Sequence, residues 1–308
     1  MIKVENVSKS FEGFQALDGL NINVQRGSIY GLIGTNGAGK TTIIKHITGV
    51  FKPDSGSIEI AGQPVYDNEE VKRHMGYVPD DLYFFGSYNL REMSRFMREL
   101  YPSWDQARYE SMVQSYELDQ KRKLGRFSKG MQKQAAFCLN MSIRPDYLIL
   151  DEPIDGLDPI VRRKTWKYIV DDCAENGMTV LVSSHNLKEM EGICDSIGII
   201  SKGRMMIERE LDDLKGDVHK VQVAFKRSDD GSLAGGAAAE ENRFSGLNVL
   251  HREKRGAVEM LIIRDKREKV EDYIEAQHPL VFDMLPLSLE EIFIYELGGE
   301  NDDIQGIF

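Results

Sequence analysis

The chain has 308 residues, of which 41% are hydrophobic and 29% charged, a composition typical of a soluble globular protein with two domains or one domain and an appendage. Its net charge of −11 argues against a nucleic-acid partner, because phosphate binding favours a basic face. No apolar run approaches the roughly 18 residues that cross a bilayer, and residues 1–7 lack the blocks of a secretory signal. The three cysteines form no C-x-x-C pair and are expected to be reduced, buried thiols of a cytosolic protein: Cys138, Cys173 and Cys194.

The first part of the chain predicts short strands around one glycine-rich loop. Alternating apolar and polar residues, or short apolar runs, predict strands at 2–7, 20–24, 28–33, 57–62 and 75–79. Phe11 and Phe14 lie in a turn-like setting between the first two strands. A helix over 42–47 is expected to begin at the loop.

That loop matches G-x-x-x-x-G-K-[ST], the pattern that binds nucleotide phosphates. Its residues are Gly34, Thr35, Asn36, Gly37, Ala38, Gly39, Lys40, Thr41 and Thr42. Glycines let backbone N–H groups turn inward around an anion, and the helix N-terminus adds partial positive charge. Lys40 would reach the β- and γ-phosphates, and the Thr41 hydroxyl would ligate Mg²⁺. An incidental glycine-rich turn is the alternative, but a chance match arises in roughly 1% of chains this long.

The middle and the end of the chain differ in pattern. Residues 89–142 have helical periodicity, and the expected elements that follow are a strand at 147–150, a helix at 160–174 and a strand at 179–183. Strands alternating with helices predict an α/β fold whose sheet is mostly parallel in its middle. Beyond residue 216 the expected elements are a strand at 218–225, a mobile loop at 228–243, a hairpin within 247–263, a helix at 266–276 and a strand at 280–285. We therefore expect two domains: 1–216, with a helical subdomain at about 86–145, and a small α+β domain at 217–308.

Two adjacent carboxylates, Asp151 and Glu152, end the apolar strand at 147–150. Buried neighbouring carboxylates repel each other and lose solvation unless a cation compensates them. A Mg²⁺ ion held by Asp151 would supply that charge and leave Glu152 as general base for the attacking water. A strand that merely ends in acids is the alternative, and the phosphate loop upstream favours the catalytic interpretation.

Three further polar positions fit either a structural or a functional role. Ser128 is expected to cap a helix, and Gly130 near the start of that helix permits close backbone approach. These residues fit a plain capped helix, or a second anion-binding helix start. His185 follows a strand, where it would either contact a γ-phosphate or have only a structural role. Asp158 would belong to the site or initiate the following helix.

With these motifs in order, residues 1–215 resemble the ATP-binding subunit of an ABC transporter. In that family Phe11 falls at the aromatic that stacks on adenine, Gly34–Thr42 is the Walker A loop, and Ser128 with Gly130 belongs to the signature motif. Asp151 and Glu152 are then the Walker B acid and the catalytic base, Asp158 lies in the D-loop, and His185 is the switch histidine. The fold implied is a P-loop NTPase cassette.

The resemblance also implies partners and a location. Two cassettes, as a homodimer or a heterodimer with a paralogue, would hold two ATP molecules, with Walker A of one facing Ser128 and Gly130 of the other. ATP would strengthen the dimer that it bridges. Closure and reopening would drive a membrane-spanning permease subunit from the cytoplasmic side of the cell membrane.

The chain departs from the family pattern at the signature, where Lys129 and Met131 replace Gly and Gln, and at the Q-loop. There Asp80 stands where the family has Gln. A carboxylate accepts hydrogen bonds but cannot donate them, and it adds negative charge near the triphosphate. We expect Asp80 to make hydrolysis more dependent on Mg²⁺ or on partner docking, unless its side chain only points to solvent.

These departures and the C-terminal part resemble the ATPases of two-component exporters. Segment 80–96, with Tyr83, Phe84, Phe85 and Tyr88, would then receive a helix of the membrane subunit, unless its aromatics belong to the core. Three other ATPase classes compete. DNA-repair and chromosome ATPases carry a long coiled coil between Walker A and the signature, and translation factors need two cassettes. A regulatory ATP-binding subunit would lack the base that Glu152 supplies.

Overall fold

The computed structural model describes residues 1–213, 218–225 and 243–297. The chain divides into two compact units, Met1–Glu208 and Arg209–Phe308. The loop expected at 228–243 lies outside the described residues except for Arg243.

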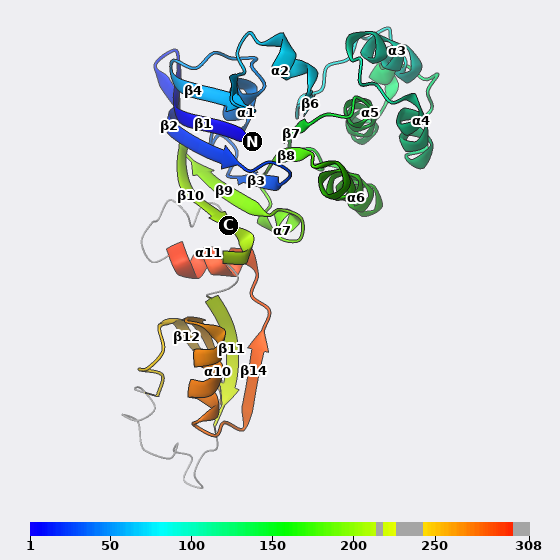
Figure 1. The fold of residues 1–308 in the computed structure, drawn as a ribbon. Coiled ribbons are helices and arrows are strands. Elements are labelled where there is room, and N and C mark those ends of the chain that lie inside the picture. The colour runs from blue at the N-terminus through cyan, green and yellow to red at the C-terminus, as the bar shows by residue number, and fades with distance from the viewer. Residues whose placement is uncertain (214–217, 226–242, 298–308) are drawn as a thin grey trace. The chain divides into compact units, whose positions relative to one another are not determined.

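The first unit is built on a six-stranded sheet with the strand order β10-β9-β3-β8-β7-β6 (Figure 1). The strands are β3 (Ile29–Ile33), β6 (Met75–Val78), β7 (Tyr147–Asp151), β8 (Thr179–Ser184), β9 (Ser196–Ser201) and β10 (Arg204–Glu210). The pairings of β3 with β8 and β9, and of β7 with β6 and β8, are parallel. All residues of β3, β7 and β8 are buried, which explains their continuous apolar runs. The predicted α/β fold with a parallel central sheet is confirmed.

A second, antiparallel sheet in this unit has the order β2-β1-β4-β5. Its strands are β1 (Ile2–Phe11), β2 (Phe14–Val24), β4 (Ser55–Ile60) and β5 (Gln63–Pro64). The first two strands are longer than the sequence predicted, because Phe11 pairs with Phe14 across the two-residue turn between them. Glu12 and Gly13 both have positive φ there, of 47° and 86°, as a tight hairpin turn requires.

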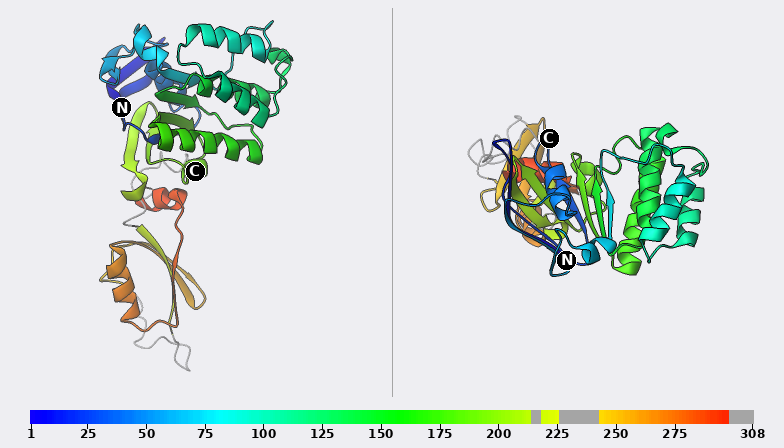
Figure 2. Two further views of the ribbon diagram at one scale, coloured as in Figure 1. Left: turned by 45° about the vertical axis from the view of Figure 1, so that its right-hand side comes forward. Right: turned by 90° about the horizontal axis from the view of Figure 1, so that it is seen from above.

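Helices cover the parallel sheet and form a helical lobe beside it (Figure 2). They are α1 (Lys40–Ile47), α2 (Glu69–Arg73), α3 (Leu90–Leu100), α4 (Gln106–Ser115), α5 (Lys129–Ser142), α6 (Pro159–Asn176) and α7 (Leu187–Met190), with a 3₁₀ turn at Leu124–Arg126. The lobe consists of α3, α4 and α5, and α5 contacts both of the other two. A capping box joins Asn89 and Glu92 at the start of α3 and fixes where this helix begins.

The described part of the second unit contains an antiparallel sheet with the order β12-β13-β11-β14, together with helices. Its elements are β11 (Val218–Ala224), β12 (Val249–Arg255), β13 (Val258–Arg264), α10 (Arg267–Glu275), β14 (Val281–Leu285) and α11 (Leu289–Leu297). Val270 and Ile274 of α10 are buried with Val221 and Val223 of β11, so α10 covers one face of this sheet. The sequence predicted each of these elements except α11.

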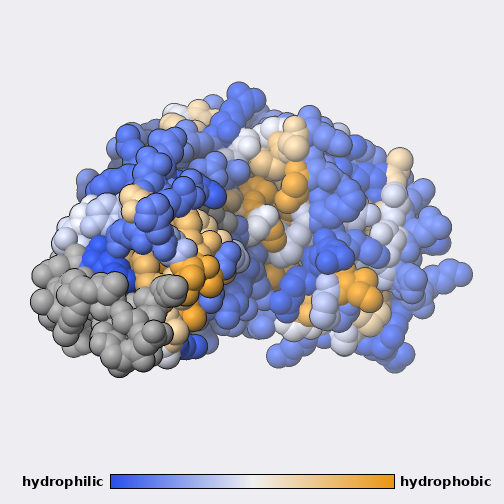
Figure 3. All heavy atoms as spheres, turned by 90° about the horizontal axis from the view of Figure 1, so that it is seen from below, coloured by the Kyte–Doolittle hydropathy of each residue, from blue (hydrophilic) through white to orange (hydrophobic). Residues whose placement is uncertain are grey.

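Hydrophilic residues cover most of the face drawn in Figure 3, and apolar residues form smaller patches on it. Within the described residues, no helix combines the length and the apolar character needed to cross a membrane. All three cysteines are free and buried, as the sequence predicted. Burial raises the pKa of each thiol, that of Cys173 to about 11.

Candidate functional site

The phosphate loop connects the carboxyl end of β3 to the N-terminus of α1. Gly39 caps α1 with φ of 109°, a left-handed conformation that favours glycine. A Cβ on Gly39 would also lie 3.0 Å from the carbonyl oxygen of Ala16, which leaves little room for a side chain. Glycine is favoured at position 39 because of the positive φ and because a Cβ would lie too close to Ala16.

The Lys40 side chain folds back over the loop. It is 6% exposed, and its ammonium donates hydrogen bonds to the carbonyls of Gly34 at 2.7 Å and Thr35 at 3.2 Å. The same Nζ lies 3.2 Å from Oε1 of Glu152. The lysine predicted to bind phosphate and the predicted base are therefore direct neighbours.

A cavity of about 270 Å³ opens beside the loop. It is lined by Phe14, Ala16, Thr35, Asn36, Gly37, Gly39, Lys40, Thr41, Thr42, Asp80 and Glu152. Segments that are far apart in sequence meet here because β3, β6 and β7 all end at the same edge of the parallel sheet, where ligands of such sheets bind.

Asp151 is fully buried at the end of β7. Its Oδ1 accepts a 2.6 Å hydrogen bond from Ser183, and its Oδ2 has no hydrogen-bond partner among the described residues. Burial raises the pKa of this carboxyl, and Asp80 and Glu152 raise it further, while Ser183 and the nearby Thr41 hydroxyl lower it. A buried carboxylate with an unpaired oxygen next to a threonine hydroxyl fits a divalent cation, which would favour its ionised form.

The Glu152 carboxylate lies between two basic side chains. Oε1 faces Lys40, and Oε2 lies 3.0 Å from Nδ1 of His185. Its side chain is 12% exposed, so it is close to the cavity yet largely shielded from solvent. The structure thus brings Lys40, Glu152 and His185 together in one cluster.

Asp80 does not simply point to solvent. It lines the cavity, and its Oδ1 lies 3.1 Å from the Nζ of Lys133 on α5. Its side chain is half exposed, whereas that of Lys133 is 9% exposed. A buried ammonium therefore balances the charge that Asp80 adds.

Ser128, Gly130 and Asp158 do not line this cavity. Ser128 caps α5 by accepting a hydrogen bond from the N–H of Met131, and Asp158 caps α6 by accepting from Ile160 and Val161. A Cβ on Gly130 would lie 3.5 Å from the carbonyl of Gly156, so the starts of α5 and α6 are neighbours. Ser128 and Asp158 thus have the capping role that the sequence offered as one of two interpretations.

The aromatic at the cavity is Phe14 rather than Phe11. Phe11 packs edge-on against Phe51, with the ring centroids 5.6 Å apart, and the Lys9 ammonium lies 5.4 Å from its ring centroid. Phe14 is 68% exposed. The base-stacking role predicted for Phe11 stays a prediction, and the geometry adds Phe14 as a second position for it.

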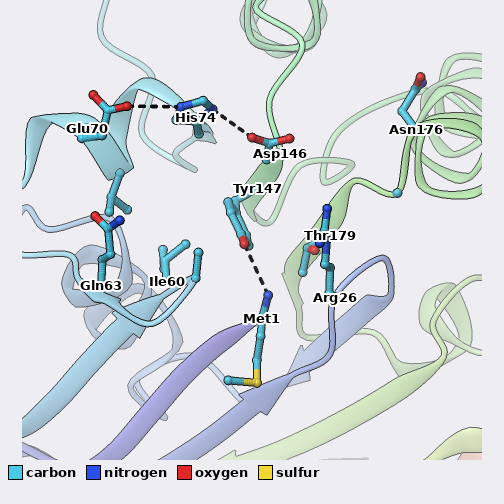
Figure 4. Close-up of a pocket in the computed structure, with 13 residues that line it drawn as sticks. Met1, Arg26, Ile60, Gln63, Glu70, His74, Asp146, Tyr147, Asn176 and Thr179 are labelled. Atoms are coloured by element: carbon cyan, nitrogen blue, oxygen red, sulfur yellow. Dashed lines mark hydrogen bonds and ion pairs between the residues drawn. The ribbon is translucent and has the colours of Figure 1, made fainter.

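A larger cavity of about 550 Å³ lies elsewhere in this unit (Figure 4). Tyr147 and Thr179, the first residues of β7 and β8, line it, and His74 is held there between Glu70 and Asp146. This cavity is at the opposite ends of the strands from Asp151 and contains none of the predicted site residues. We assign the site to the smaller cavity, where the convergent charged groups are.

Known proteins resemble this chain in sequence. A sequence profile described as "ABC transporter" matches residues 17–155. The ABC transporter ATP-binding protein YtrB of Bacillus subtilis (strain 168) is 30% identical over 300 residues, which cover 97% of this chain and 99% of that protein. The bacitracin transport ATP-binding protein BcrA of Bacillus licheniformis is 34% identical, with 74% of this chain and 76% of BcrA covered.

Solved structures have the same fold. The ATP-binding subunit of an ABC transporter superposes with a TM-score of 0.65 at 31% identity, covering 70% of this chain and 92% of that one. A dimeric bacterial ABC transporter cassette gives a TM-score of 0.63 at 22% identity, covering 68% and 99%. The YtrB match extends over nearly the whole chain and therefore includes the second unit.

Proposed function

The chain belongs to the ATP-binding subunits of ABC transporters, and we propose that it is the motor of an exporter whose membrane-spanning part is a separate subunit. It is an ATPase, as cassettes of this family are. The observation that carries the site assignment is the cluster of Lys40, Glu152 and His185 beside a cavity lined by the phosphate loop. The test is ATP hydrolysis by the isolated chain, measured beside its Glu152→Gln variant.

ATP would bind with its phosphates on the loop and Lys40, and with its base near Phe11 or Phe14. Glu152 would take the proton of the attacking water, and His185 would orient that carboxylate and approach the γ-phosphate. Since Lys40 already contacts Glu152, a triphosphate would compete with the carboxylate for the ammonium. That competition would leave Glu152 free to accept a proton when nucleotide is bound.

Mg²⁺ would be held by Asp151 and the Thr41 hydroxyl, and would neutralise charge on the phosphates. The fit rests on the buried Oδ2 of Asp151, which has no protein partner among the described residues. Ser183 orients the other oxygen of this carboxylate at 2.6 Å. Residues that orient a metal ligand in this way typically affect metal affinity 10–100-fold.

Ser183→Ala is therefore expected to raise the Mg²⁺ concentration needed for half-maximal ATP binding by about tenfold. The measurement is a Mg²⁺ titration of the binding of a fluorescent ATP analogue, which does not depend on turnover. Ser184→Ala is the matched control, because the Ser184 hydroxyl accepts a hydrogen bond from the N–H of Asn186 and does not contact Asp151. Equal Mg²⁺ requirements in the two variants would contradict the proposed role of Asp151.

Cassettes of this family form dimers and work with membrane permeases. For this chain we propose a head-to-tail homodimer, or a heterodimer with a paralogous ATPase, in which Ser128 and Gly130 of one subunit contact the ATP bound by the other. This arrangement would explain why neither residue lines the cavity of its own chain.

The membrane subunit would dock on an aromatic surface formed by Tyr83, Phe84, Phe85 and Tyr88 in the segment between β6 and α3. None of the four is buried, and Tyr83 is 87% exposed, which argues against a core role. The Phe85 ring lies 5.0 Å from that of Tyr88 and 5.4 Å from that of Phe96. Exposed, mutually packed aromatics are typical anchors of protein interfaces.

Phe85→Ala or Tyr88→Ala is expected to weaken co-purification with the membrane subunit at least about fivefold, because truncating an interface anchor commonly costs more than about 1 kcal/mol. Affinity for ATP should stay unchanged. Tyr66→Ala is the control, since Tyr66 is an exposed aromatic outside this surface. Loss of ATP binding in the Phe85 or Tyr88 variant would count against a docking role.

Export, rather than import, is proposed because BcrA is named for bacitracin transport and another relative, YbhF of Escherichia coli (strain K12), as a probable multidrug transporter ATPase. The chain would then work at the cytoplasmic face of the cell membrane, held there by its membrane subunit. Purifying the complex from native membranes would identify that subunit and the stoichiometry.

A further inference from the structure

Lys133 is a buried lysine near the start of α5, 8% exposed. Its ammonium lies 3.1 Å from Oδ1 of Asp80 and donates a 2.7 Å hydrogen bond to the backbone carbonyl of Glu152. A buried ammonium is costly unless it is paired and hydrogen-bonded, and these two contacts meet that requirement. One side chain thus joins α5 to the segment after β6 and to the end of β7.

The backbone of Glu152 needs such support. Its φ is 47°, in the left-handed region that a residue with a long side chain rarely adopts. Such conformations are strained and persist only where the surroundings hold them in place. The Ser183 hydroxyl accepts a hydrogen bond from the N–H of Glu152, and Lys133 donates to its carbonyl, so side chains hold both of its backbone polar groups.

The placement of charged side chains at this edge of the sheet also explains why Lys133 and Asp80 are paired. Asp80 and Glu152 are two carboxylates that line the same small cavity, and the carboxylate of Asp151 directly precedes Glu152 in the chain. Lys40 faces Glu152, while Lys133 faces Asp80. Asp80 therefore keeps a buried cation in place, and without Asp80 the ammonium of Lys133 would lose its ion-pair partner.

We propose that Lys133 is a positioning residue for Glu152 and that Asp80 serves as its counter-ion. This inference rests on the proposed role of Glu152 as the base. It also changes the effect on hydrolysis that we expect from replacing Asp80, the residue at the Q-loop position. Replacing Asp80 with the family's glutamine should slow hydrolysis, because the change removes the charge that stabilises Lys133.

Lys133→Met is expected to lower kcat about tenfold or more, since a misplacement of about 1 Å at a reacting group can cost up to 100-fold. KM and the affinity for a fluorescent ATP analogue should change less than about twofold, because Lys133 does not line the cavity. Lys133→Arg should restore most of the rate by donating to the same carbonyl. Lys167→Met is the matched control, as Lys167 forms an exposed ion pair with Asp171 on α6.

A double-mutant cycle with Asp80→Asn tests the pairing. Asp80→Asn should lower kcat in the parent chain and have little further effect in the Lys133→Met chain, because residues that act as one unit are not additive. If Lys133→Met fails to fold, the neutral pair Asp80→Asn with Lys133→Gln provides the test. Its amide keeps a donor for the Glu152 carbonyl and should retain more activity than Lys133→Gln alone.

The result that overturns the inference is an unchanged kcat in Lys133→Met, or additive effects across the cycle, in a chain that Glu152→Gln inactivates. Full turnover in Glu152→Gln would instead overturn the proposed function itself. The two failures are therefore distinguishable with the same set of proteins.

Discussion

The Glu152→Gln variant is expected to lose at least about 100-fold in ATP turnover, the size of effect that a positioned general base contributes. Glutamine keeps the shape of the side chain and its contact with His185, but it cannot take a proton from water. ATP binding should persist, because the phosphate loop is untouched. Replacing the carboxylate also removes a partner that competes with phosphate for Lys40, which lies 3.2 Å away.

The measurement combines steady-state hydrolysis with size-exclusion chromatography in the presence of ATP. We expect the variant to accumulate as an ATP-bound dimer, since bound ATP stabilises the associated state and is no longer consumed. Glu191→Gln, on an acidic residue outside the cavity, serves as the control. Turnover near that of the parent chain in Glu152→Gln would refute the base assignment.

Mixing two inactive variants is expected to recover activity. Lys40→Ala removes the phosphate-binding ammonium, and Gly130→Asp places a carboxylate where the proposed dimer brings the neighbour's triphosphate. In a head-to-tail pair of one Lys40→Ala chain with one Gly130→Asp chain, one of the two composite sites is intact. Each variant alone has a defect in both sites and should lose nearly all hydrolysis, because stabilising phosphate charge is usually a dominant catalytic effect.

Gly130 suits this experiment because its Cβ position is in ordinary contact distance of its own chain, 3.5 Å from Gly156 and Leu157 atoms. Gly130→Ala should therefore fold normally and controls for local packing. The readout is ATP hydrolysis as a function of the mixing ratio, with a maximum near equal amounts. If no mixing ratio gave ATP hydrolysis, the result would contradict the proposal that the neighbouring subunit completes the site.

Much of the site follows from the order of motifs along the chain. The phosphate loop, the acids after β7 and the histidine after β8 could be predicted because each directly follows a short apolar strand. The carboxyl ends of parallel strands lie at one edge of the sheet. Residues that follow adjacent strands were therefore expected to lie close together in space. Ser183 was missed, although its place at the end of β8, the strand that pairs with β7, was a usable signal.

No sequence pattern indicated that Lys133 lies close to the site. A lysine inside an amphipathic helix normally indicates a solvated face, and only the packing of α5 near Asp80 and Glu152 reveals that this one is buried. The short elements β5 and α2 were missed for a different reason, since they are too brief to show a period. Phe11 and Phe14 illustrate a third limit, because pairing across a hairpin decides which ring meets the cavity.

The shielding of the natural thiols has a practical consequence for following movement in this motor. Cys138, Cys173 and Cys194 are buried, and their raised pKa values keep them protonated and unreactive near neutral pH. A single cysteine introduced in place of the exposed Tyr83 would thus be the preferred target of a maleimide dye. Fluorescence from that one label could report how the proposed docking segment, 80–96, responds to nucleotide, with the native cysteines left in place.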